Sequence, residues 1–156
     1  MAKTTPATLA LRKAGIAFEL HSYAYDPEAS SIGLQAAQAL GADPARVLKT
    51  LMTLVDGRPV CVVLASDREI AMKALASAMK AKSAQMMRPA DAERLTGYRV
   101  GGVSPFGQKR VVPTVIDAAV QDQTRVFVNG GQRGLQVELA VQDLVAALGA
   151  QVAKVS

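Results

Sequence analysis

The sequence predicts a mixed α/β domain in which helices pack outside a mixed sheet of about six or seven strands. Three observations support this prediction. Helix-like and strand-like segments recur along the 156 residues, and they show neither an internal repeat nor a regular strand–helix alternation. A tight Asp56-Gly57 turn joins two central apolar runs. A chain of this length can bury a real core, so we expect one domain over residues 1–156 without an internal linker.

The first half of the chain predicts two helices, one strand and a central strand pair. Thr5 followed by Pro6 is typical of an N-cap and a first helical position, and Gly15 ends the short helix. Asp56-Gly57 is favoured in two-residue hairpin turns, so the runs on either side should pair. The predicted segments are a helix over 5–14, a strand over 16–20, a helix over 31–40 and strands over 47–55 and 60–65.

The second half combines short helices with strands. Ile70, Met72, Leu75 and Met79 have helical spacing, and Gly97 ends a later helical turn. The predicted segments are a helix over 70–79, a short strand over 84–87, a helical turn over 91–96, strands over 111–117, 125–129 and 135–139, a helix over 140–148 and a final strand over 151–155.

Composition and charge limit the class of protein. The N-terminus lacks an apolar core of signal-peptide length, and the strongly apolar run 60–65 is far shorter than the roughly 20 residues that span a bilayer, so we expect a cytoplasmic protein without a membrane partner. The net charge is +5, and residues 68–110 hold nine basic residues against three acidic ones. Such a region suits a phosphate-rich partner, although a solvated face without a partner explains the charge equally well.

Two glycine-rich segments stand out from the scaffold. Residues 101–110 read GGVSPFGQKR and residues 130–134 read GGQRG. Glycine lets a ligand approach the main chain closely, and backbone N–H groups beside Lys109 and Arg110 suit an anion or a polarised carbonyl. An ordinary surface turn is the alternative for either segment alone. The presence of both makes coincidence a weaker explanation.

Lys49 is the unusual side chain of the central strands, because in period two it shares a face with Val47, Leu51 and Val55. Its ammonium either reaches water from a strand edge or points into a pocket, where it orients a carboxylate, a phosphate or a carbonyl oxygen. Tyr23 and Tyr98 border loops, and each could hold a sugar or base or simply pack with its hydroxyl in solvent.

Several kinds of chemistry lack the residues they need. His21 is the only histidine and Cys61 the only cysteine, so no zinc site and no ready nucleophile–histidine pair is evident. We expect Cys61 to be a buried thiol. Neither glycine segment is a P-loop or a dinucleotide-binding turn. We therefore expect no metal and no cofactor, and we assign no role to Asp117 or Glu138.

The motifs together resemble the YbaK family, free-standing relatives of the editing domain inserted in bacterial prolyl-tRNA synthetases. The resemblance covers nearly the whole chain and implies that family's barrel-like sheet. It rests on Tyr23, Leu48-Lys49-Thr50-Leu51, Thr96-Gly97-Tyr98, GGVSPFGQKR, Pro113-Thr114-Val115-Ile116-Asp117 and GGQRGLQVEL.

The resemblance implies a trans-editing deacylase that removes cysteine from mischarged tRNA(Pro). The substrate thiol would attack its own ester and leave as a thiolactone, which makes the enzyme formally a lyase; otherwise it is an ester hydrolase. Lys49 would correspond to the essential lysine of the family, and the amides around Gly101 and Gly102 would face the developing oxyanion. Aminoacyl-tRNA would be the partner, with prolyl-tRNA synthetase as an open second one and DNA excluded.

The expected substrate-binding residues lie in four parts of the chain. They are Tyr23, Ile32, Tyr98, Gly101, Gly102, Ser104, Pro105, Phe106, Gly107, Asn129, Gly130, Gly131, Arg133 and Gln136, with Lys82, Arg88, Lys109 and Arg110 as weaker candidates for tRNA phosphate contacts. Ile32, Asn129 and Gln136 stand where the best-known member has Phe, Ser and Asp, which leaves alanine or another small amino acid open as the preferred substrate. Ser104 has no histidine placed to activate it. The alternative from another class is a non-catalytic module that binds the tRNA acceptor end or a synthetase.

Overall fold

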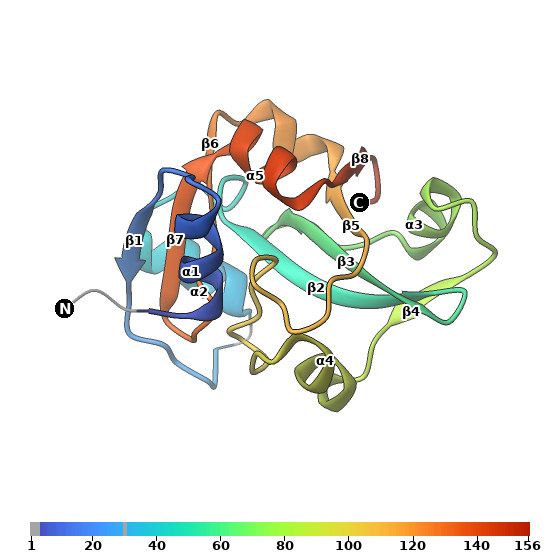
Figure 1. The fold of residues 1–156 in the computed structure, drawn as a ribbon, viewed down its shortest axis with the longest axis horizontal. Coiled ribbons are helices and arrows are strands. Elements are labelled where there is room, and N and C mark those ends of the chain that lie inside the picture. The colour runs from blue at the N-terminus through green and yellow to red at the C-terminus, as the bar shows by residue number, and fades with distance from the viewer. Residues whose placement is uncertain (1–3, 30) are drawn as a thin grey trace.

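The computed structural model describes residues 4–29 and 31–156, with Ile32 and Gly33 described by their backbone alone (Figure 1). The helices and strands are α1 (Pro6–Lys13), β1 (Glu19–Ser22), α2 (Ile32–Leu40), β2 (Leu48–Val55), β3 (Arg58–Ala65), α3 (Met72–Ala78), β4 (Ala84–Met86), α4 (Pro89–Thr96), β5 (Thr114–Asp117), the 3-10 helix η1 (Ala118–Asp122), β6 (Arg125–Asn129), β7 (Leu135–Ala140), α5 (Val141–Leu148) and β8 (Gln151–Ala153).

The described strands form two sheets. One contains β1-β7-β6, paired antiparallel throughout, and the other contains β4-β2-β3-β5-β8, in which β3, β5 and β8 run parallel. An isolated parallel bridge between Val47 and Phe127 links the sheets where β2 begins. The mixed α/β class is confirmed. The described residues contain eight strands in two sheets, where the sequence predicted one sheet of about six or seven strands. The split into two sheets depends on pairing between distant segments, which leaves no local pattern.

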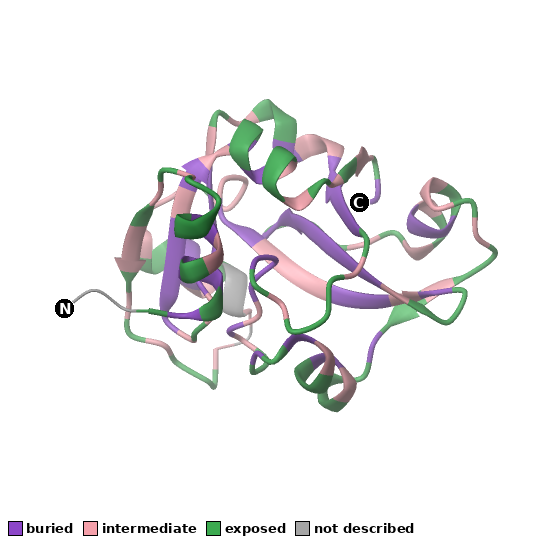
Figure 2. Cartoon of the chain, viewed as in Figure 1, coloured by how far each residue is buried: buried purple, intermediate pink, exposed green. Residues whose placement is uncertain are grey.

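One apolar core joins the two sheets. Val63 and Met52 from the larger sheet belong to the same buried cluster as Val137 and Leu139 from the smaller one. Helix α1 adds Leu11 to this cluster, whereas α2 covers the other face of the smaller sheet with Ala36 and Ala37 against Phe127. Figure 2 shows the buried strands inside and the exposed faces of α1, α4 and α5 outside.

Most predicted elements are confirmed, and local chemistry explains them. Thr5 and Thr8 form a capping box at α1, and Asp56 (φ 49°) and Gly57 (φ 78°) both adopt the positive φ that the tight hairpin turn requires. The first predicted strand is displaced, because residues 16–18 pack against the core before β1 starts at Glu19. The strand predicted over 111–117 begins only at Thr114, since Val111 is 92% exposed.

Two buried polar groups have structural roles. Cys61 is fully buried as expected, and burial raises the pKa of its thiol to about 12. Asp117 fixes the end of the chain, because its carboxylate accepts hydrogen bonds from the Val155 N–H (2.9 Å) and the Ser156 hydroxyl (2.8 Å).

Within the described residues, no helix has both the length and the hydropathy to cross a membrane.

A substitution at Gly107 can test whether the close packing of the first glycine segment on α1 stabilises the fold. Its φ is +65°, and an added Cβ would lie 2.4 Å from the Pro6 carbonyl oxygen. We expect Gly107→Ala to lower the free energy of unfolding by about 2–4 kcal/mol, the sum of backbone strain and overpacking. Gly15→Ala is the matched control, because Gly15 has φ +72° but no atom within 4 Å of the added Cβ. Equal losses in urea titrations of the two variants would show that the close contact is unimportant.

Candidate active site

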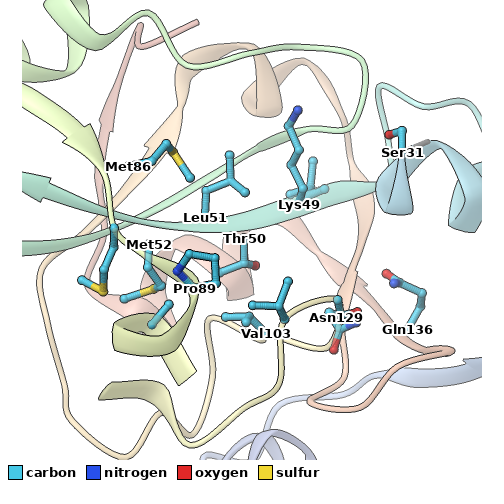
Figure 3. A pocket seen from close by; sticks show the side chains of 15 residues that line it. Ser31, Lys49, Thr50, Leu51, Met52, Met86, Pro89, Val103, Asn129 and Gln136 are labelled. Atoms are coloured by element: carbon cyan, nitrogen blue, oxygen red, sulfur yellow. Dashed lines mark hydrogen bonds between the residues drawn. The ribbon is translucent and has the colours of Figure 1, made fainter. Parts of the chain in front are cut away.

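A cavity of about 300 Å³ opens beside the first half of β2 (Figure 3). Three groups of residues surround this strand. The cavity is lined by Leu48, Lys49, Thr50, Leu51 and Met52 of β2, by Met86, Met87, Pro89 and Ala92 around β4 and α4, by Val100, Gly101 and Val103 of the first glycine segment, and by Ser31, Asn129 and Gln136.

The cavity exists because one edge of β2 is left open. Strand hydrogen bonds alternate in direction, and the Met52 carbonyl accepts from the Met87 N–H (3.1 Å) on the side away from β3. Thr50 lies two residues earlier and directs its backbone to the same side. There β4 has already ended, since it pairs only with residues 53–55. The Thr50 backbone therefore faces the gap between β4 and β6.

Lys49 and Thr50 project from opposite faces of β2, and both line the cavity (Figure 3). Lys49 is half-buried. Burial lowers the pKa of its ammonium, and the carboxylates of Glu69 and Asp67 offset part of that change. Of the two interpretations of Lys49, the structure thus favours the one in which its side chain borders a pocket.

Three buried polar atoms around the cavity have no hydrogen-bond partner in the part of the chain that the structure describes. They are the Thr50 Oγ1, the Gln136 Oε1 and the Tyr23 hydroxyl. Gln136 is 4% exposed. Burial raises the pKa of Tyr23, and the adjacent Gln136 side chain offsets part of that rise, although the two groups do not reach hydrogen-bond geometry. Leaving such a group unpaired costs about 1–3 kcal/mol. A bound polar ligand would remove this cost, so the arrangement makes the cavity a candidate binding site.

The register of the smaller sheet brings these residues together. Asn129 of β6 pairs with Gln136 of β7, and Gln136 pairs with His21 of β1. Tyr23 follows β1 by one residue and shares the face of His21 through strand alternation. The consecutive strands β6 and β7 and the distant residue after β1 therefore place an amide, a second amide and a phenol at one end of the sheet.

Asn129 holds the two glycine segments against each other. Its Nδ2–H donates to the Gly101 carbonyl (3.2 Å), and its Oδ1 accepts from the N–H groups of Gly131 (2.7 Å) and Gln132 (3.2 Å). Arg133 adds a bond from its Nε to the Val100 carbonyl (2.9 Å). The second glycine segment thus fixes the position of Gly101 at the cavity.

The structure separates the predicted site residues into two groups. Lys49, Gly101, Asn129 and Gln136 line the cavity, with Tyr23 beside Gln136. The remaining described ones, outside the lining, are Tyr98, Gly102, Ser104, Pro105, Phe106, Gly107, Gly130, Gly131 and Arg133. The predicted role of Ile32 concerns a side chain outside the described residues.

Internal contacts account for several residues of the second group. Tyr98 is 4% exposed, and its hydroxyl donates to the Phe106 carbonyl (2.5 Å), so this hydroxyl has a partner inside the fold. Burial raises the pKa of Tyr98 to about 12. Ser104 is fully buried, and its Oγ accepts from the Phe106 N–H (3.2 Å).

The expected oxyanion amides are only partly available. The Gly102 N–H already donates to the Arg99 carbonyl (2.8 Å), which closes a turn. A Cβ on Gly102 would lie 2.8 Å from the Arg133 backbone nitrogen, so glycine here serves packing between the two segments. Of the two glycine amides expected to face the oxyanion, only that of Gly101 is therefore kept as a candidate.

Sequence reasoning missed Thr50 and the methionines of the cavity wall. A polar residue within an apolar strand was the available signal for Thr50, which was already part of the Leu48-Lys49-Thr50-Leu51 motif. Met52, Met86 and Met87 gave no such signal, because methionine is a common filler of ordinary cores.

The lone histidine belongs to an ionic cluster away from the cavity lining. His21 Nε2 lies 3.0 Å from Glu138 Oε1, and Arg125 Nε lies 3.1 Å from Glu138 Oε2. Burial alone would raise the pKa of Glu138, but the bonds from Arg125 and His21 outweigh it and hold this pKa below its usual value. Glu19 completes a group of three possible metal ligands within 4.8 Å, although Glu138 is already neutralised by arginine.

The fold and cavity together define a single mixed α/β domain whose cavity is lined by apolar and polar side chains, with no nucleophile–histidine pair among the described lining residues. The chain belongs to the aminoacyl-tRNA editing domain family, whose model matches residues 26–147.

The relatives are consistent with this assignment. EbsC of Enterococcus faecalis, named as a candidate Cys-tRNA(Pro)/Cys-tRNA(Cys) deacylase, is 35% identical over 121 residues, which are 77% of this chain and 74% of EbsC. A proline–tRNA ligase of Acidithiobacillus ferrooxidans is 31% identical over 81 residues, covering 52% of this chain and 14% of the ligase. A solved structure described as a candidate trans-editing enzyme for prolyl tRNA synthetase shares the fold, with a TM-score of 0.84 at 21% identity over 99% of both chains.

The pKa of Lys49 gives a direct test of the site electrostatics. Because Glu69 raises this pKa, we expect Glu69→Gln to lower it further below the usual lysine value. The measurement is an NMR titration of the lysine side-chain resonances. Asp122→Asn removes an equal charge from an exposed position of η1 and should leave the Lys49 resonance unchanged. An upward shift in Glu69→Gln would contradict the assigned environment of Lys49.

Proposed function

We propose that this protein is a trans-editing aminoacyl-tRNA deacylase that removes cysteine from mischarged tRNA(Pro). The observation that carries the proposal is the cavity at the open edge of β2, which is bordered on one side by the partly desolvated Lys49 and elsewhere by buried polar atoms that have no partner among the described residues. Family membership supplies the class of substrate. Charged tRNA is a cytoplasmic molecule, so the proposed reaction places the protein in the cytoplasm and in the control of translation fidelity.

The described residues that line the cavity include no cysteine, histidine or carboxylate, so the Ser31 and Thr50 hydroxyls have no imidazole or carboxylate base there to activate them. Ser104 is fully buried, Cys61 is a buried thiol with its pKa raised to about 12, and His21 is bonded to Glu138. The substrate thiol can take this role: its sulfur forms a bond to the carbonyl carbon while the ester C–O bond breaks. The thiol proton is transferred in effect to the ribose oxygen, and the products are a thiolactone and free tRNA.

The cavity residues then position the ester and stabilise its charge. The Lys49 ammonium would face either the developing oxyanion or the terminal nucleotide, and the Gly101 backbone lies on the cavity wall that the first glycine segment forms. The unpaired Gln136 Oε1 is an acceptor, which suits the substrate α-ammonium, and the Thr50 hydroxyl can bond the ester or ribose. Such positioning accelerates an intramolecular attack without protein acid–base chemistry.

Two alternatives follow from particular residues. Gln136 and Asn129 differ from the best-known pattern and border the cavity, so alanine or serine esters are possible substrates. The lack of a nucleophile also fits a module that binds the tRNA acceptor end or a synthetase without turnover. The match to a proline–tRNA ligase favours that synthetase as a partner.

A deacylation panel separates these proposals. We expect release of tRNA(Pro) from its cysteinyl ester, and we expect Lys49→Ala to reduce the rate at least ~100-fold, the effect of losing one preorganised charge-stabilising group. Lys73→Ala, an exposed lysine of α3, is the control and should retain the wild-type rate. Binding of charged tRNA without release of cysteine, alanine or serine would favour the non-catalytic module.

The origin of the nucleophile is tested on the substrate. S-methylation of the cysteine on tRNA(Pro) removes the attacking thiol, so the rate should fall to the uncatalysed level while charged tRNA still binds. Alanyl-tRNA(Pro), which has a side chain of similar size but no thiol, is the second control substrate. Equal rates for thiol and S-methyl substrates would point to an activated water instead.

A further inference from the structure

A basic groove adjoins the pocket around the end of the β2–β3 hairpin. One depression of about 540 Å³ shares Met87 with the pocket, and a second of about 680 Å³ shares Pro59 and Arg110 with the first. The three hollows therefore follow one another along the surface. Their lining residues run from β2 past α4 to the β2–β3 hairpin turn. Figure 1 shows α4 and that hairpin on the side of the molecule away from the β1-β7-β6 sheet.

Basic side chains line this groove. They are Arg58, Lys80, Arg94, Lys109 and Arg110, against only Asp56 and Asp91. The Asp56 carboxylate accepts hydrogen bonds from the N–H groups of Lys82 (3.1 Å) and Ser83 (3.0 Å), and Asp91 is paired with Arg94 and Arg88. Both acids are thus engaged.

The other four cations have no carboxylate within ion-pair distance among residues 4–29 and 31–156: Arg58, Lys80, Lys109 and Arg110. Three lie on fixed backbone. The Lys109 N–H donates to the Thr96 carbonyl (2.8 Å), the Arg110 N–H donates to the Leu95 carbonyl (3.2 Å), and Arg58 begins β3. A row of unpaired cations on an ordered backbone attracts a row of anions.

We propose that this groove binds the sugar–phosphate backbone of the tRNA acceptor strand where that strand leaves the pocket. The inference rests on the proposed function, because it places the terminal residue of the tRNA in the cavity beside Lys49. A polymer held there by its end must cross the adjoining surface, and the groove that shares Met87 supplies cations along that path. An acidic protein would need no such connection to the pocket, so the geometry favours RNA.

The groove extends the set of phosphate contacts that the sequence indicates. Lys109 and Arg110 line it directly, whereas Arg88 is paired with Asp91 at the start of α4 and Lys82 lies beside the hairpin turn. Arg58 and Lys80 are new members. Folding brings them to Arg110 although they lie 52 and 30 positions earlier in the sequence.

The test replaces three groove cations by glutamine: Arg58→Gln, Lys109→Gln and Arg110→Gln in one chain. Binding of uncharged tRNA(Pro) is measured over a range of salt concentrations, so the result does not depend on turnover. Each lost phosphate contact lowers the slope of log K against log salt by about 0.7–0.9, so we expect the slope to fall by roughly 2 and the affinity to fall at least ~10-fold.

Lys13→Gln, Lys73→Gln and Lys154→Gln in one chain form the matched control, since these three lysines are exposed and lie outside the groove. This variant loses the same charge and should bind tRNA as the wild type does. Cleavage of cysteinyl-adenosine, which lacks the strand, should be unchanged in both variants.

The outcomes separate this inference from the proposed function. Equal tRNA affinity and salt slope in the two triple variants would overturn the groove, even if cysteinyl esters are cleaved. Loss of prolyl-tRNA synthetase binding alone, with tRNA binding intact, would also overturn it and identify a protein interface. Failure of the wild type to cleave any ester would instead remove the deacylase proposal.

Discussion

The hydrogen bonds of the Asn129 amide are the interaction on which the rest of the site depends. One side chain, 8% exposed, bonds both glycine segments, and it does so from the end of β6. Thr5 ties the same region to α1 through its hydroxyl and the Gly130 carbonyl (2.5 Å). Gly101 therefore reaches the cavity on a rigid support. The glycines allow this close packing of backbones, and most of them contribute to structure, not to ligand contact.

The open edge of β2 is the second constraint. An unpaired strand edge attracts other strands, and proteins often protect such edges with a lysine. Lys49 lies on this stretch of β2, so the same side chain can both discourage strand addition and present a cation to the cavity. Burial lowers the pKa of this lysine, and the apolar Leu51 projects from the same face of β2 (Figure 3).

Local patterns were sufficient to predict most of the elements, because caps, turn pairs and apolar periodicity act over a few residues. Asp56-Gly57 fixed the hairpin, and Gly41 and Gly97 ended their helices with positive φ, as expected. The smaller sheet depends on pairs such as Glu19 and Glu138, and the bridge between Val47 and Phe127, 80 positions apart, links it to the larger sheet. No local pattern indicates such distant pairs. For the same reason the sequence indicated Lys49 and Gln136 only as separate candidates. It could not show that the Tyr98 hydroxyl and the Gly102 N–H form hydrogen bonds inside the fold.

The polar atoms without partners are what distinguish a binding site here from a defect of packing. Thr50 Oγ1, Gln136 Oε1 and the Tyr23 hydroxyl come from three strands or their ends, yet all lie at or next to one cavity. Each of these atoms would gain a hydrogen bond by moving into solvent or toward a polar neighbour. Each is held in place by the strand pairing that also packs the core. A ligand with an ammonium and an ester offers donors and acceptors to such a set. Because Gln136 is neutral, it can accept from that ammonium without the charge attraction of a carboxylate, so recognition at this position depends on hydrogen-bond geometry.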